Sequence, residues 1–336
     1  MNYQYNGGKI YKKINGVITL NPLYIALTCI AAIAVIIPGI SLVCFFIIFY
    51  SPRRKENKNG RIEIPNDEIY QVHRELIESW VISARTSPHK DVEIKSYDGL
   101  TLKGKFYEYA PKAVIEIMFH GYHGNSERDM SGGIVRASAL GHSALVVDQR
   151  GAGRSDGKVV TFGVREHRDV LSWIDFVLKE IDPDAKIILT GISMGASTVL
   201  IASGQALPKN IVGILADCGY TSAKAIIKKV LGDMKLPPNV MYPFVKLGAR
   251  IFGGFNLDEI SPIEAVKNSK VPTIFFHGET DSFVPHSMSE ENFKACIAPK
   301  KLVLIKGAGH GLAFPANQEL YIKEAKEFFD TYITVK

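Results

Sequence analysis

The sequence predicts an α/β fold in which a mostly parallel sheet of eight strands carries helices on both faces, with a small helical cap and one N-terminal transmembrane helix. Three features of the 336 residues lead to this prediction. Short apolar runs alternate with helical patterns through most of the chain, which is typical of a parallel sheet covered by helices. A long segment at 221–255, predicted as the cap, interrupts this alternation. An uncharged apolar run at 23–50 precedes the whole alternating region.

Composition supports a folded body and argues against some kinds of site. Hydrophobic residues make up 46% of the chain and charged residues 22%, which is enough apolar surface for a sizeable core. The four cysteines form no CxxC pair and no cluster with histidine, so neither a disulfide framework nor a zinc site is expected. Cys29 and Cys44 lie in the apolar run, while Cys218 and Cys296 are interpreted as packing residues.

The net charge of +6 is concentrated at the N-terminus. Residues 1–61 contain one acid, Glu56, and a set of basic residues on both sides of the apolar run: Lys9, Lys12, Lys13, Arg53, Arg54, Lys55, Lys58 and Arg61. The rest of the chain is close to neutral. Basic flanks of this kind suit anionic lipid headgroups, and the near-neutral body indicates no nucleic-acid partner.

Four segments follow from these patterns. We expect an N-terminal tail at 1–22, a transmembrane helix at 23–50, a basic linker at 51–65 and the α/β domain at 66–336. The apolar run is longer than the ~20 residues that cross a bilayer.

Two other interpretations of the apolar run are less consistent with its pattern. A buried core helix rarely extends this far without a charge. Ala32-Ile33-Ala34 resembles a signal-peptidase site, but strong hydrophobicity continues well beyond it. A retained anchor is therefore expected. The Lys/Arg count favours a cytoplasmic body by a small margin and leaves the orientation open.

The order of the expected elements follows from apolar periodicity and turn residues. After a helix at about 66–84, strands are expected at 92–95, 102–109, 113–119, 143–147, 186–190, 211–216, 273–277 and 302–305, the first two as an antiparallel hairpin. Helices are expected at 164–178, 196–206 and 317–332, and in the cap at 223–231 and 242–252.

The segment 191–195, Gly-Ile-Ser-Met-Gly, lies between a predicted buried strand and a helix of small and apolar residues. Strand, G-x-S-x-G and helix in this order are typical of a nucleophile elbow. The flanking glycines allow the sharp turn because a side chain at either position would collide with neighbouring elements. The helix that follows directs its free N–H groups toward Ser193, where they favour a developing anion.

The residues needed to activate such a serine follow in the order that this topology requires, first an acid and then a histidine. Asp281 lies in the loop after the strand at 273–277, and His310 lies in the glycine-rich loop after the strand at 302–305. Both loops open at the same sheet edge as the elbow. Ser193, His310 and Asp281 therefore form a candidate nucleophile, base and acid for acyl transfer.

Five motifs in this order resemble the α/β-hydrolase superfamily: 120–122 (His-Gly-Tyr), 148–155 (Asp-Gln-Arg-Gly-Ala-Gly-Arg-Ser), 191–195, 277–281 (His-Gly-Glu-Thr-Asp) and 309–310 (Gly-His). The resemblance covers about 90–335 and is strongest to the serine-aminopeptidase-like and monoacylglycerol-lipase-like branch, whose bacterial members often carry one N-terminal membrane anchor. It implies an α/β-hydrolase fold with Ser193 as nucleophile, His310 as base and Asp281 as orienting acid. It also implies an oxyanion hole formed by the backbone N–H groups of Tyr122 and Met194. No cofactor and no metal are expected.

Several of these residues have alternative interpretations. Asp217, after the strand at 211–216, is a second candidate for the catalytic acid. His120 and His123 have the i, i+3 spacing of metal ligands, with Glu127 or Asp129 as a third, although hydrogen bonding within the loop explains them more simply.

Two further motifs have structural explanations. Ser193 also has the position of an ordinary helix N-cap, but its combination with Asp281 and His310 favours the nucleophile. The glycines at 151–157 are similar to a dinucleotide fingerprint, but their last spacing is one residue too long, and they are interpreted as a turn.

The predicted reaction is cleavage of carboxylic esters with short or medium acyl chains, or of lipid-derived monoesters. Met241, Phe244 and Phe252 of the cap are expected to line the apolar substrate pocket. A serine aminopeptidase is the second interpretation, with Glu279 or Asp217 holding the substrate amine. A non-catalytic, membrane-anchored binding scaffold is the third.

Overall fold

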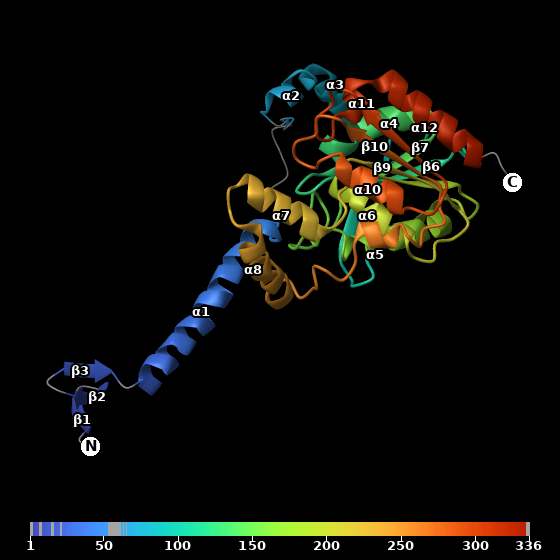
Figure 1. The fold of residues 1–336 in the computed structure, drawn as a ribbon. Helices are drawn as coiled ribbons and strands as arrows, with labels where there is room; N and C mark the ends of the chain where they lie inside the picture. Colours follow the sequence, from blue (N-terminus) through green and yellow to red (C-terminus); the bar gives the residue numbers. More distant parts are fainter. Residues whose placement is uncertain are drawn as a thin grey trace.

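The computed structural model describes residues 3–6, 9–14, 17–20, 22–52, 62, 64 and 66–333 (Figure 1). The predicted basic linker at 51–65 therefore lies outside the described residues, apart from 51, 52, 62 and 64. Within the predicted N-terminal tail, three short strands pair in an antiparallel sheet: β1 (Tyr3–Asn6), β2 (Lys9–Ile14) and β3 (Val17–Leu20).

The central sheet has eight strands in the order β11-β10-β9-β8-β6-β7-β5-β4. Their bounds are β4 Lys90–Lys95, β5 Thr101–Tyr107, β6 Ile115–Phe119, β7 Ser143–Val147, β8 Ile187–Ile192, β9 Ile211–Asp217, β10 Thr273–Gly278 and β11 Lys300–Ile305. Strands β6 to β11 pair in parallel. Strands β4 and β5 form an antiparallel hairpin, and β5 pairs antiparallel with β7. The predicted eight-stranded α/β fold with an antiparallel edge is confirmed.

Helices cover both faces of this sheet (Figure 1). On one face lie α3 (Arg74–Thr86), α4 (Ser126–Ala139), α11 (Ala313–Ala316) and α12 (Gln318–Ile333). On the other lie α5 (Glu166–Phe176), its π-helical extension η1 (Val177–Ile181), α6 (Met194–Ser203) and α10 (Ser287–Ala295). The short α9 (Pro262–Ala265) contacts α6 and α10.

The first face differs from its prediction in two helices. The helix expected at about 66–84 is divided into α2 (Glu68–Gln71) and α3 by a turn at 72–73. Helix α4 is absent from the prediction because Gly132 and Gly133 weaken its helical pattern. Packing explains both glycines: a Cβ on Gly132 would lie 2.8 Å from the Trp80 ring of α3, and one on Gly133 would lie 2.9 Å from the Met118 sulfur.

The predicted cap is present as α7 (Ala223–Asp233) and α8 (Pro238–Ile251). The long apolar helix α1 (Pro22–Ile48) ends against α8, as Figure 1 shows. At this contact Gly248 of α8 lies so close to α1 that an added Cβ would be 2.4 Å from the Ser41 carbonyl oxygen. Phe45 and Phe49 are buried there among apolar cap residues.

Hydrogen bonds extend the attachment of α1 to the α/β domain. The Val160 amide donates to the Phe49 carbonyl at 2.9 Å, and the Ser51 amide donates to the Lys158 carbonyl at 2.9 Å. The Tyr122 hydroxyl donates to the Ile48 carbonyl at 2.7 Å. One side of residues 41–51, which includes the buried Ser41, Phe45 and Phe49, therefore packs on the α/β domain, although the apolar pattern assigns most of these residues to the membrane segment.

We predict that Gly248→Ala destabilises the protein by about 1–3 kcal/mol, because the new methyl group must push a backbone carbonyl away. Thermal unfolding of the full-length protein in detergent measures this change. Gly232→Ala is the matched control in the neighbouring helix α7, where the nearest atom to the new Cβ is 3.8 Å away. The control should be neutral or stabilising, because alanine is the better helix former. Equal melting temperatures for the two variants would contradict the tight α1–α8 contact.

Candidate active site

Ser193 lies on a sharp turn between β8 and α6 with a left-handed backbone conformation, φ 56°. This conformation is strained for any residue other than glycine, and it occurs mainly where the surrounding structure fixes the residue. The flanking glycines explain how the turn closes. A Cβ on Gly191 would lie 2.2 Å from the Gly195 backbone, and one on Gly195 would lie 1.9 Å from the Phe119 carbonyl oxygen. The elbow thus folds only with glycine at both positions.

A continuous chain of hydrogen bonds connects Ser193, His310 and Asp281. The His310 Nε2 atom is 2.9 Å from the Ser193 Oγ atom, and its Nδ1 atom is 2.7 Å from the Asp281 Oδ2 atom. Asp281 and His310 come from the loops after β10 and β11, as the sequence indicates. The structure therefore brings the three predicted residues together in the order acid, imidazole, hydroxyl.

Asp281 is held as a carboxylate. Burial alone would raise the pKa of Asp281, but hydrogen bonds from His277 and His310 outweigh it and hold the pKa well below its usual value. The Phe283 and Val284 amides also donate to the Asp281 Oδ1 atom, at 2.9 and 2.8 Å. An ionised, fixed acid of this kind orients the imidazole and stabilises its protonated form.

The loop after β6 lies directly beside the serine. A Cβ on Gly121 would be 3.5 Å from the Ser193 Cβ, so the Gly121–Tyr122 backbone reaches the elbow. The Met194 amide is the first N–H of α6, where no helical acceptor is available. Within the described part of the chain, neither the Tyr122 nor the Met194 amide has a hydrogen-bond acceptor. Both N–H groups can therefore donate to an oxyanion.

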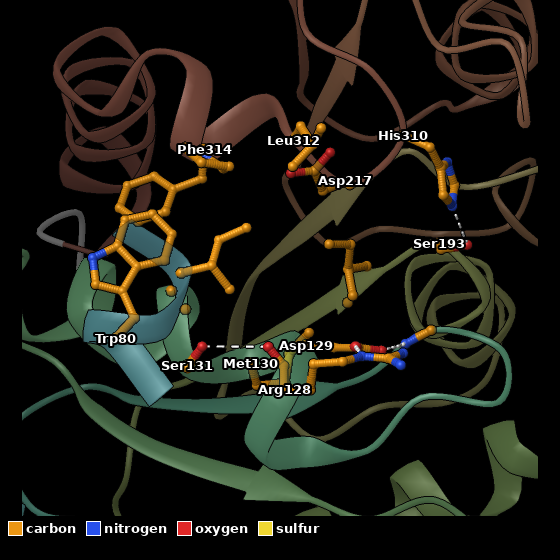
Figure 2. Close-up of a pocket in the computed structure, with 18 of the residues that line it drawn as sticks. Trp80, Arg128, Asp129, Met130, Ser131, Ser193, Asp217, His310, Leu312 and Phe314 are labelled. Carbon is orange, nitrogen blue, oxygen red and sulfur yellow. Dashed lines mark hydrogen bonds and ion pairs between the residues drawn. The ribbon is translucent and has the colours of Figure 1, made fainter. Parts of the chain in front are cut away.

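A cavity of about 290 Å³ opens at Ser193 and His310 (Figure 2). It extends along the α4 face of the sheet to the stacked rings of Trp80 and Phe314, whose centroids are 5.2 Å apart. Figure 2 shows these rings at the opposite end of the cavity from Ser193. The cavity is mainly apolar, and its apolar side chains include Ile77, Trp80, Met130, Ile192, Leu215, Leu312 and Phe314.

The predicted cap residues lie elsewhere. Met241, Phe244 and Phe252 do not line this cavity. The ring centroids of Phe252 and Phe45 of α1 are 6.0 Å apart. Met241 and Phe244 pack against the buried apolar cluster between the cap and α1. The apolar cap surface that the sequence assigns to substrate is instead partly covered by a segment far away in the chain.

Helices α2 and α3 contribute to this site in a way that was not predicted from the sequence. The Tyr70 hydroxyl donates to the His310 carbonyl at 2.8 Å, and Trp80 closes the far end of the cavity. Their helical spacing is visible in the sequence, but nothing in it indicates that this face covers the loop of His310 rather than ordinary core.

The alternative site residues have other partners. The Asp217 side chain accepts a hydrogen bond from Tyr321, while His310 bonds to Asp281. Both ring nitrogens of His120 are used within the loop region, since Nδ1 contacts the Gly121 carbonyl and Nε2 accepts from the Gln149 amide. His123 stacks on the Tyr122 ring.

The remaining candidates for a metal or nucleotide site also have structural partners. Glu127 pairs with Arg85, and Asp129 accepts from the Gly121 amide. The glycines at 151–157 form a turn closed by the Gly151 amide and the Asp156 carbonyl. Cys218 lies near Asp281 and His310, but burial raises the pKa of its thiol far above the usual value and so disfavours the thiolate that binds metals.

Comparison with known proteins supports the fold. The model of the alpha/beta hydrolase fold matches residues 117–258, which include the Gly121–Tyr122 loop and the elbow. The chain has the alpha/beta hydrolase fold. Among solved structures, the esterase Pf2001 of Pyrococcus furiosus superimposes with a TM-score of 0.62 at 22% identity, covering 81% of this chain and 97% of the esterase.

Curated relatives match smaller parts of the chain. The uncharacterized protein YqkD of Bacillus subtilis is 26% identical over 192 residues, which span 57% of this chain and 63% of that protein. The acyltransferase drtE of Aspergillus calidoustus is 30% identical over 119 residues, which span 34% of this chain and 38% of that protein.

We predict that Asp281→Asn reduces the rate of labelling by a fluorophosphonate by about 10⁴-fold, because the imidazole loses its orienting carboxylate. Asp258→Asn is the control. It removes a carboxylate that pairs with Lys246 in the cap region rather than with His310. A rate for Asp281→Asn within tenfold of the wild-type rate would show that this carboxylate does not serve His310.

Proposed function

We propose that this protein is a member of the α/β-hydrolase superfamily, and that it is a serine hydrolase that cleaves carboxylic esters through an acyl-enzyme on Ser193. The observation that supports this most directly is the hydrogen-bonded chain from Asp281 through His310 to Ser193 at the opening of an apolar cavity. The strained elbow supports it too, because backbone strain is typically retained where it positions a reacting group.

In the proposed reaction His310 accepts the Ser193 hydroxyl proton as Oγ attacks the ester carbonyl carbon. The Tyr122 and Met194 amides stabilise the resulting oxyanion. His310, now protonated and paired with ionised Asp281, gives the proton to the leaving alcohol as the ester C–O bond breaks. Water then attacks the acyl-enzyme by the same route and releases the carboxylic acid.

The cavity favours short or medium acyl groups. Its volume of about 290 Å³ is at the lower limit of ligand pockets, which range over roughly 300–1,000 Å³. The esterase name of the Pyrococcus structure is consistent with ester substrates. Alcohols can replace water in the second step, and the fungal acyltransferase relative gives a reason to test them as acceptors.

The other proposed activities have weaker support. An aminopeptidase needs an exposed acid beside Ser193 to hold the substrate amine. Glu279 is exposed and does not line the cavity. Asp217 lines the cavity but is buried, and the positive charge of Arg136 lies close enough to act on it, which disfavours a substrate ammonium there. A non-catalytic scaffold has no need for the strain at Ser193 or for the aligned histidine.

We also propose that α1 anchors the protein in a membrane. The helix is long and apolar enough to cross a bilayer, and its first two thirds are exposed, with Leu23, Val35 and other large apolar side chains facing outward. A soluble core helix would be mostly buried. The buried end at Phe45 and Phe49 also argues against removal of the segment as a signal peptide, since cleavage within α1 would strip a helix that packs on the cap.

The catalytic proposal predicts that a fluorophosphonate labels the full-length wild-type protein and that Ser193→Ala abolishes both labelling and hydrolysis of p-nitrophenyl butyrate. Ser197→Ala is the control, because Ser197 lies on the same helix one turn further and bonds to the Tyr220 backbone. Folded wild-type protein that is neither labelled nor active on esters would rule out the serine hydrolase.

The anchoring proposal predicts that the full-length protein stays in the membrane pellet after extraction at alkaline pH, because the apolar surface of α1 must leave water. The intact mass of the protein should include residues 22–48. Release into the soluble fraction, or a mature chain that begins within α1, would contradict a retained anchor.

A further inference from the structure

We propose that the cavity contains a built subsite for a neutral hydroxyl group on the acyl arm of the substrate, formed by Arg136 and Asp217. The inference rests on the proposed function, since it names the substrate class that the same site would accept. It starts from the polar side chains that line an otherwise apolar cavity.

The floor of the cavity is a patch of the sheet next to the elbow. In the parallel pairing of β8 and β9, Thr190 is opposite Leu215 and Ile192 is opposite Asp217. Residues two apart on a strand face the same side, so these four side chains share one face, and all four line the cavity. The floor therefore begins beside Ser193 and extends roughly 7 Å along the strand.

Arg136 of α4 reaches this floor as a buried ion. Its guanidinium Nη2 atom donates to Glu116, whose carboxylate also accepts from His142 and Thr190. Arg136 and Glu116 are 4% and 0% exposed, so the positive charge is neutralised within the protein. The cavity thus presents Arg136 as a hydrogen-bond donor more than as a net charge.

Two polar atoms of this floor have no hydrogen-bond partner in the described part of the chain: the Nε atom of Arg136 and the Oδ1 atom of Asp217. Asp217 is 5% exposed, and its other oxygen accepts from the Tyr321 hydroxyl at 3.0 Å. An unpaired buried donor or acceptor costs about 1–3 kcal/mol. A ligand group that satisfies both atoms would therefore be bound selectively.

The chemistry of the two atoms identifies that group. Arg136 can only donate and an ionised Asp217 can only accept, so a ligand group that satisfies both must accept and donate, as a hydroxyl does. A carboxylate would be repelled by Asp217, and an ammonium ion would offer no acceptor to Arg136. Burial raises the pKa of Asp217, whereas the hydrogen bond from Tyr321 and the nearby charge of Arg136 favour its ionised form.

The subsite suits the acyl arm rather than the alcohol. The leaving alcohol must depart before water attacks the acyl-enzyme, whereas the acyl arm stays attached to Ser193 through both steps. The buried floor beside Ser193 is therefore assigned to the acyl group that remains. The preferred substrates would therefore be esters of hydroxylated acids of short or medium length.

The test compares pairs of p-nitrophenyl esters, with and without a terminal hydroxyl, over acyl chains of about four to eight carbons, a range set by the ~7 Å reach. For at least one length, wild-type kcat/KM should be about tenfold or more higher for the hydroxylated ester, because two unpaired atoms become bonded. An active enzyme that prefers the unsubstituted ester at every length would overturn the subsite, and would show that solvent alone satisfies the two atoms.

The double variant Asp217→Leu/Tyr321→Phe removes the acceptor together with the hydroxyl that it bonds, so that no new polar group is left unpaired. The ratio of the two kcat/KM values is an internal measure that cancels changes in overall activity, and it should fall toward one. Asn292→Ala is the matched control. Asn292 is also buried with an unpartnered oxygen, but it does not line the cavity, so the ratio should be unchanged. If the double variant does not fold, the wild-type comparison decides alone.

A binding measurement separates failure of the subsite from failure of the proposed reaction. Titration calorimetry of the wild-type protein with hexanamide and 6-hydroxyhexanamide needs no catalysis. About tenfold tighter binding of the hydroxylated amide supports the subsite even if no ester is cleaved. Equal affinities would overturn it whether or not the enzyme is active.

Discussion

The backbone of Ser193 is the constraint on which the rest of the site depends. Its left-handed conformation is stable only because β6, β8 and α6 approach one another too closely for any side chain at Gly191 or Gly195. This close packing fixes the serine at the carboxyl edge of the sheet. It also places the Gly121–Tyr122 loop beside it, and the loops after β10 and β11 then need to supply only a carboxylate and an imidazole. The strained backbone of Ser193 thereby holds its side chain in line with those of His310 and Asp281.

The N-terminal helix is attached to the same assembly. Its end at Ile48 accepts a hydrogen bond from Tyr122, the residue whose amide faces the proposed oxyanion. Phe45 and Phe49 pack between the cap and the turn around Phe162. A membrane anchor joined in this way would hold the site at a fixed distance from the bilayer, unlike one connected through a flexible tether. The substrate would then be met close to the membrane surface.

Much of this architecture is predictable from local patterns. The eight strands, the cap and the order serine, acid, histidine follow from short apolar runs and from glycines at turns, because these depend on neighbours in the chain. The cavity does not follow. Gly132 and Gly133 weaken the helical pattern of α4 in the sequence. The reason for these glycines is the close packing of Trp80 and Met118, which lie far from them in the chain or on another element. Phe252 has the composition of a pocket residue, but its partner Phe45 lies some two hundred residues away. Contacts of this kind leave no periodic signal.

The central claim, an acyl-enzyme on Ser193, is tested most directly by mass spectrometry of protein quenched in acid during turnover of a p-nitrophenyl ester. We predict a mass increase equal to the acyl group, located by peptide mapping on the segment that contains Ser193 and lost when excess hydroxylamine is added. Ester turnover with no adduct, together with an unchanged rate for Ser193→Ala, would contradict it.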